Sequence, residues 1–220
     1  MTELPLSLSV STGDGMCVRM LERGTKIPAS ATRIFTTKRF MPSAVMAEIV
    51  MGERIRAKDN KRIRRVRLGG IKKSAGRIAR ISVTLEAGDD GTLVIQMFDY
   101  GSHHKKRKTV RDSRWVPSEE EVLAAVKEAE EHFEEERRID GNCRLLGKAR
   151  KTVLITDTLK RADKNSLTSD ELADVKAKAS DLKKRIKLKP ENISEVDAKI
   201  INEEIKAVYK ILEKTASADG

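Results

Sequence analysis

The chain has 220 residues, of which 39% are hydrophobic, 36% are charged and 3% are aromatic, and its formal net charge is +11. This composition supports at least one buried core and excludes collagen-like, mucin-like and low-complexity proteins. No run approaches the roughly 18 to 20 apolar residues of a membrane span, and the N-terminus lacks the basic start and apolar run of a secretory signal. We therefore expect no membrane partner and a location in the cytoplasm or an organelle matrix.

The positive charge is concentrated in the first half of the chain. Residues 1–114 hold 24 Lys and Arg against 11 Asp and Glu, a net charge of +13, whereas residues 115–220 carry a net charge of −2. Such a shift in charge indicates separate domains. The predicted domains are therefore residues 1–114 and residues 115–220.

The first half has the short alternating runs that are typical of β-strands. Leu6, Leu8 and Val10 share one face, and residues 12–15 (Thr-Gly-Asp-Gly) form a turn signal before Met16. Six further strand candidates follow, over 33–37, 44–51, 66–68, 78–85, 92–98 and 108–110. Short strands at this spacing predict an antiparallel β-sandwich.

The second half has helical periodicity. Ser118 with Glu121, and Thr168 with Glu171, have the spacing of capping boxes, which satisfy backbone N–H groups at the start of a helix. Apolar residues at helical spacing follow both boxes and Pro190, and a longer helix is expected over 139–161. The predicted fold class is thus β plus α, a sandwich followed by an α-helical bundle.

Side chains that could carry catalysis or bind a metal are not arranged for it. His103 and His104 are adjacent, but no further ligand lies at a suitable spacing, so a hairpin tip explains them better. Cys17 and Cys143 lie far apart and form neither a disulfide framework nor a zinc motif. No Ser/His/Asp set and no pair of carboxylates suggests an active site. We expect no catalytic residues, no metal and no enzyme activity in this chain.

Blocks of the sequence carry a resemblance that covers most of residues 4–138. They are Leu4-Pro5-Leu6-Ser7-Leu8, Ile27-Pro28, GERIRAKDNKRI (52–63), LGGI (68–71), ISVTLEAGDDGTL (81–93) and the helix VKEAEEHFEEERR (126–138). In order and spacing they resemble the substrate-binding part and the first lid helix of the seventy-kilodalton heat-shock chaperones, the DnaK-like family. Beyond residue 138 only a helical pattern remains.

The resemblance implies a β-sandwich whose loops cradle an extended peptide under a helical lid. By positional match, the peptide-binding residues would be Val10, Thr12, Gly13, Phe35, Lys38, Val45, Ala47, Ile81 and Val83. The six apolar residues would line a pocket for a Leu-like side chain, whose burial is worth roughly 2 kcal/mol, and Thr12 would supply backbone contacts. Alternation alone favours a simpler interpretation, in which all six are ordinary core residues.

Several positions depart from the family pattern. Gly13 and Lys38 occupy the positions where the family has two apolar residues arching over the peptide, so weaker binding and faster exchange are expected. Phe40 and Gly76 replace an acidic and a basic residue that would latch the lid. Arg54 is expected either to pair with an acidic residue at 135 or 136 or to be a solvated surface charge.

Two classes of function follow. The favoured class is a peptide-binding chaperone module of the stress response that binds unfolded or extended polypeptides. The family's ATPase domain would precede Leu4, so we expect no cofactor in this chain; ATP would act only through an ATPase domain in cis or in trans, and co-chaperones are further implied partners. The less favoured class is a nucleic-acid or ribosome-binding protein, because residues 58–67 hold six Lys and Arg and residues 105–108 are all basic. Against this second class, the chain lacks the surface aromatic residues that stack on bases.

Overall fold

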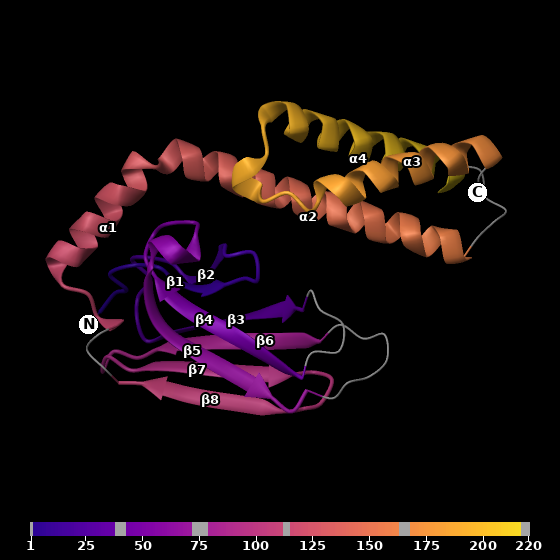
Figure 1. Cartoon of the computed structure of the whole chain (residues 1–220). Helices are drawn as coiled ribbons and strands as arrows, with labels where there is room; N and C mark the ends of the chain where they lie inside the picture. The colour runs from indigo at the N-terminus through magenta and orange to yellow at the C-terminus, as the bar shows by residue number, and fades with distance from the viewer. Residues whose placement is uncertain (1, 38–42, 72–78, 112–114, 163–167, 217–220) are drawn as a thin grey trace. The chain divides into compact units, whose positions relative to one another are not determined.

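The computed structural model describes residues 2–37, 43–71, 79–111, 115–162 and 168–216 (Figure 1). These residues form two antiparallel sheets of four strands each and four α-helices, which confirms the predicted β-plus-α class. The chain divides into two compact units, Met1–Phe133 and Glu134–Gly220. A functional division between residues 114 and 115 stays a prediction.

The first unit is a β-sandwich. One sheet has the order β2-β1-β4-β5 and the other has the order β3-β6-β7-β8. The strands are β1 (Leu8–Ser11), β2 (Cys17–Leu21), β3 (Ala29–Thr36), β4 (Ala44–Met51), β5 (Lys61–Gly69), β6 (Arg80–Ala87), β7 (Leu93–Asp99) and β8 (Lys105–Val110). Because β2 contacts β3 and β5 contacts β8, the two sheets stack with their edge strands together.

The sandwich core is built from the inward faces of both sheets. Ile49 on β4 and Leu85, Leu93 and Ile95 on β6 and β7 are completely buried, as period-two alternation requires. Trp115, which follows the sandwich, is 1% exposed and donates a hydrogen bond from Nε1 to the carbonyl oxygen of Gly91 at 2.8 Å. Tryptophan is buried at low cost only when its N–H finds such an acceptor.

Three strands, β3, β5 and β8, are longer than their sequence pattern predicts, and β3 begins at Ala29 rather than at residue 33. β5 begins at Lys61 rather than at residue 66, and β8 begins at Lys105 rather than at residue 108. β5 and β8 are edge strands, where basic side chains reach solvent on either face and hide the alternation. His103 and His104 lie in the connection between β7 and β8, so their interpretation as a hairpin tip is confirmed.

The first helix, α1 (Glu119–Glu131), belongs to the sandwich unit. Ser118 accepts a hydrogen bond from the Glu121 backbone, and the Glu121 side chain accepts one from the Ser118 backbone, which is the predicted capping box. Val122, Ala125 and Val126 on one face of the helix pack against the sandwich core. The helix is therefore held by an apolar face as well as by its cap.

The second unit contains α2 (Phe133–Ala162), α3 (Ser169–Arg185) and α4 (Glu195–Ala216). Leu146, Leu182 and Ile201 are fully buried in one shared core, so these helices form the predicted bundle. The predicted capping box at Thr168 and Glu171 is present at the start of α3. Within the residues that the structure describes, no helix is long and apolar enough to cross a membrane, and no cluster of three or more His, Cys, Asp or Glu could hold a metal ion.

Candidate functional site

The apolar residues of the expected pocket come together at one end of the sandwich. Phe35 near the end of β3 pairs with Ile81 at the start of β6. Val45 lies at the start of β4 in the opposite sheet, and Val10 near the end of β1 pairs with Ile49, four residues further along β4. Two strand ends from each sheet thus bring inward-facing side chains to the same end of the core.

Burial divides these residues into an inner and an outer group. Val10, Ala47, Ile81 and Val83 are at most 3% exposed and belong to the core, whereas Phe35 and Val45 are half-buried and pack against that core from its margin. A ligand side chain entering this end would first meet Phe35 and Val45. All six residues therefore contribute to the core, and two of them lie at its margin.

The polar positions of the expected site lie in the turn between β1 and β2. Thr12 donates from its backbone N–H to the carbonyl of Met16 at 2.8 Å, and its own carbonyl accepts from Gly15 at 2.9 Å. Gly13 is exposed in the same turn. Backbone contacts from Thr12 to a ligand would replace hydrogen bonds that the turn already makes. Lys38, Phe40 and Gly76 lie outside the described residues.

Arg54 is not a solvated surface charge, so that interpretation is wrong. The residue is 5% exposed, and its Nη1 lies 2.6 Å from Oε1 of Glu128 on α1. Its Nη2 lies 3.8 Å from Oδ2 of Asp59. The observed partner on the helix is Glu128, seven residues before the first partner that the sequence suggested. A buried guanidinium needs such a carboxylate, because an unpaired charge in a desolvated site is costly.

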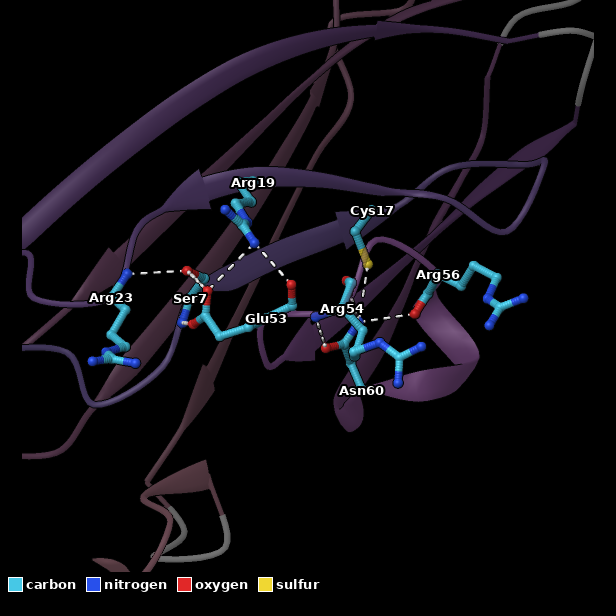
Figure 2. A network of polar contacts seen from close by, with 8 residues as sticks. All are labelled: Ser7, Cys17, Arg19, Arg23, Glu53, Arg54, Arg56 and Asn60. Atoms are coloured by element: carbon cyan, nitrogen blue, oxygen red, sulfur yellow. Dashed lines mark hydrogen bonds and ion pairs between the residues drawn. The ribbon is translucent and has the colours of Figure 1, made fainter. Parts of the chain in front are cut away.

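A hydrogen-bonded loop holds Arg54 in position (Figure 2). Asn60 donates from Nδ2 to the carbonyl oxygens of Arg54 at 2.7 Å and Arg56 at 2.9 Å, and its Oδ1 accepts from the Arg54 backbone at 3.1 Å. The same Nδ2 lies 3.4 Å from the sulfur of Cys17 on β2. One amide side chain therefore closes the loop between β4 and β5 on itself and ties it to the neighbouring strand.

A second set of contacts anchors the start of this loop to the chain before β1. The Glu53 carboxylate accepts hydrogen bonds from the Ser7 backbone at 2.7 Å and the Ser7 hydroxyl at 3.0 Å. The same hydroxyl accepts from the Arg23 backbone, and Arg19 donates to the Glu53 carbonyl at 2.8 Å (Figure 2). The loop that presents Arg54 to α1 is thus fixed at both ends.

Gly52 is the position in this loop that only glycine fits well. Its φ is +145°, and a Cβ there would collide with the Asn60 side chain. We expect Gly52→Ala to lower the free energy of unfolding of the sandwich unit by about 1–3 kcal/mol through backbone strain and loss of the Asn60 hydrogen bonds. Urea unfolding followed by tryptophan fluorescence measures this.

Gly13→Ala is the matched control, because nothing lies within 4 Å of a Cβ at that turn position and its backbone needs no positive φ. The control should shift the unfolding midpoint little. Equal shifts for the two variants would contradict the role given to Gly52.

Together these features define an antiparallel β-sandwich with an apolar end and an ion-paired first helix. The family model described as Hsp70 protein matches residues 3–217. The chain is also 30% identical over 200 residues to the chaperone protein DnaK of Buchnera aphidicola subsp. Schizaphis graminum, an alignment that covers 90% of this chain and 31% of that relative. The chain therefore belongs to the Hsp70 family, and it spans about a third of the length of that relative.

The sequence analysis did not predict the ion pair between Arg54 and Glu128, although one feature of the sequence indicates it. Glu121 and Glu128 are seven residues apart, so they lie on the same face of a helix. Lys61 contacts Glu121 at 2.9 Å and Arg54 contacts Glu128, so a cation from β5 and one from the loop before it reach that face. A search for acidic residues at this spacing, beside the apolar stripe of α1, would have suggested Glu128.

Proposed function

We propose that residues 1–114 form the peptide-binding part of an Hsp70-family chaperone and that the helices of residues 115–220 form its lid. The ligand would be an extended, apolar segment of an unfolded polypeptide. The observation that supports this most is the half-buried apolar margin at Phe35 and Val45, beside a core of small and branched side chains, in a chain of this family.

The proposed interaction follows from ordinary peptide recognition. An extended peptide satisfies its backbone groups on the loops, while one pocket accepts an apolar side chain and provides the selectivity. Val10, Ala47, Ile81 and Val83 would form the floor of this pocket, below the two residues of the margin. Gly13 and Lys38 would flank the peptide without covering it, which favours fast exchange.

In this proposal the chain binds and releases peptide and performs no chemical step of its own. ATP would act on it only through an ATPase domain of the family, in the same chain or in another one. Co-chaperones and a location in the cytoplasm or an organelle matrix stay predictions.

A pair of labelled heptapeptides with the same Leu-rich core tests the proposal by fluorescence anisotropy. One peptide carries Glu on both sides of the core and the other carries Lys. We expect saturable binding of the Glu-flanked peptide in the micromolar range, about −8 kcal/mol, with no requirement for ATP. If neither peptide shows saturable binding at low salt, the proposed function is wrong.

DnaK-like chaperones are expected to prefer peptides with basic residues beside the apolar core, which suits an acidic rim around the peptide site. In this chain the rim is basic, so we expect the opposite preference. Arg80 precedes Ile81 on β6, and Arg67 and Lys105 lie at the same end of the sandwich on β5 and β8; all three are exposed. We expect Glu flanks to strengthen binding by about 0.5–1 kcal/mol per charge relative to Lys flanks, with the difference shrinking as salt rises. Arg80→Gln should reduce the difference, whereas Lys26→Gln, an exposed cation outside this group, should not.

A further inference from the structure

The two basic segments of the sequence form the adjoining edges of the two sheets. β5 ends one sheet and β8 ends the other, and the two strands contact each other. β5 carries Lys61, Arg62, Arg64, Arg65 and Arg67, and β8 carries Lys105, Lys106, Arg107 and Lys108, all of them exposed. We call these nine residues the basic edge. Segments more than 35 residues apart in sequence are thus combined into one surface.

Acidic neighbours neutralise only part of the basic edge. Glu48 lies 2.8 Å from Arg65 and 3.6 Å from Arg62, while Glu86 pairs with Arg107 and Glu121 pairs with Lys61. Among the described residues, no acidic side chain forms an ion pair with the other members of the basic edge. These are Arg64, Arg67, Lys105, Lys106 and Lys108.

Some of these unpaired cations lie on the inward faces of the two edge strands. Lys106 and Lys108 pair with the buried residues Met97 and Ile95, so they lie on the inward face of their sheet. Arg64 pairs with Ile49, which is also buried, so it faces inward from the other sheet. Like charges therefore lie on the inward faces of both adjoining edge strands. Their mutual repulsion is unfavourable unless an anion lies between them.

A groove runs along one end of the basic edge. Its volume is about 450 Å³, and its polar lining comes from Lys61, Arg62 and Arg64 on β5 and from Thr109 and Arg111 at the end of β8. Ile63, Val110 and Trp115 complete the lining. This end is opposite to the one that holds Val45 and Ile81, since Lys61 pairs with Met51 at the far end of β4. The groove is thus separate from the proposed peptide site.

We propose that the basic edge binds single-stranded nucleic acid through its phosphates, without reading the base sequence. Arginine binds phosphate in a bidentate manner, and a cationic groove that follows the backbone is the usual basis of such binding. The groove of about 450 Å³ can hold part of a flexible single strand but not a duplex. Trp115 is buried and cannot stack on a base, so affinity depends on charge.

An acidic polypeptide fits this surface less well. It would bind an edge strand most strongly by adding a strand to the sheet, which needs a regular row of free backbone groups. The pairing of β4 and β5 is irregular between Ile49 and Val50, opposite Ile63, and the inward charges on both edges also oppose strand addition. Charges of either sign on an edge strand would prevent it from pairing with another chain. The charged residues of β5 and β8, however, are all cations.

Binding of a labelled single-stranded RNA of about 12 nucleotides to the full chain tests this inference. We expect a Kd between about 10⁻⁶ and 10⁻⁴ M near physiological salt and, if about five phosphates are neutralised, a slope of log K against log salt near −3.5. Single-stranded DNA of equal length should bind equally, because the 2′-hydroxyl is not read. The double variant Arg64→Glu with Lys108→Glu should weaken binding at least about tenfold.

The matched control carries the same change in charge elsewhere on the sandwich. Arg33 is an exposed, inward-facing cation on β3, the opposite edge of the same sheet as β8, and Lys26 is exposed just before that strand. Arg33→Glu with Lys26→Glu should weaken binding less than about threefold. Arg64→Gln with Lys108→Gln should lower the RNA affinity less than the charge reversal at the same two positions. Circular dichroism checks that all variants are folded.

Three results would overturn the inference. Equal losses in the two double reversals would show an effect of net charge alone. Unchanged RNA binding by the variant Arg64→Glu with Lys108→Glu would mean that these two cations only prevent the edge strands from pairing with other chains. Tighter binding of a duplex, or of a polyglutamate peptide of equal charge, would assign the surface to a different polyanion.

Discussion

Glu128→Gln should destabilise the sandwich unit by about 2–3 kcal/mol, more than Arg54→Met should, although the two residues form one ion pair. Glu128 is 53% exposed in its side chain and Arg54 is 4% exposed. Removing the carboxylate leaves a buried cation that lies 3.8 Å from Asp59, and a buried charge without a close carboxylate is costly. Removing the cation leaves a carboxylate that water can solvate, at a cost of about 1 kcal/mol from lost packing.

Chemical unfolding of the single and double variants forms a double-mutant cycle for this pair. We expect Arg54→Met with Glu128→Gln to be about as stable as Arg54→Met alone, since the carboxylate matters only when the buried charge is present. Glu131→Gln is the control: its pair with Lys127, at 3.9 Å, lies on the exposed surface of α1 and should contribute less than about 0.5 kcal/mol. Similar small losses for Glu128→Gln and Glu131→Gln would mean that the buried Arg54 does not depend on Glu128.

Val45→Phe should reduce the affinity for the Glu-flanked heptapeptide by more than about tenfold, or about 1.4 kcal/mol. Val45 is half-buried at the start of β4, opposite Leu68. A phenyl ring at this margin would fill the space above Ala47 and exclude the ligand side chain. Anisotropy titration with the wild-type and variant chains measures the change.

Val94→Phe makes the same substitution at another half-buried strand position. Val94 lies on the outer face of β7, between Glu86 and Thr109, and points away from the core. This control should bind peptide as the wild type does. If Val45→Phe also binds normally while remaining folded, the pocket lies elsewhere even though the chain belongs to a chaperone family.

Local signals in the sequence predicted the regular elements well. β4 has the predicted bounds, 44–51, because its turn signals and inward alternation agree, and both capping boxes form as their spacing indicates. β5 and β8 were predicted too short, because an edge strand exposes charged side chains on both faces and loses its period. Their pairing into one basic surface depends on how the sheets stack, which no local pattern encodes.

The residues of the candidate site could be predicted only where their position on the inward face of a strand determines their role. Alternation and the family resemblance together suggested Val45 and Ile81, and the structure gives both residues a place at one end of the core. Arg54 was misjudged because an isolated arginine in a loop is usually solvated. Its burial depends on Asn60, Asp59 and Glu128, residues up to 74 positions away.

Trp115, with its indole nitrogen bound to Gly91, gives this protein a convenient spectroscopic reporter. It is the single tryptophan of the chain and lies in the sandwich unit, so its emission reports the unfolding of that unit. Most helical residues belong to the second unit, so the far-ultraviolet ellipticity reports mainly on the bundle. Coincident transitions from the two signals would indicate cooperative unfolding of both units, and separate transitions would give each unit its own stability.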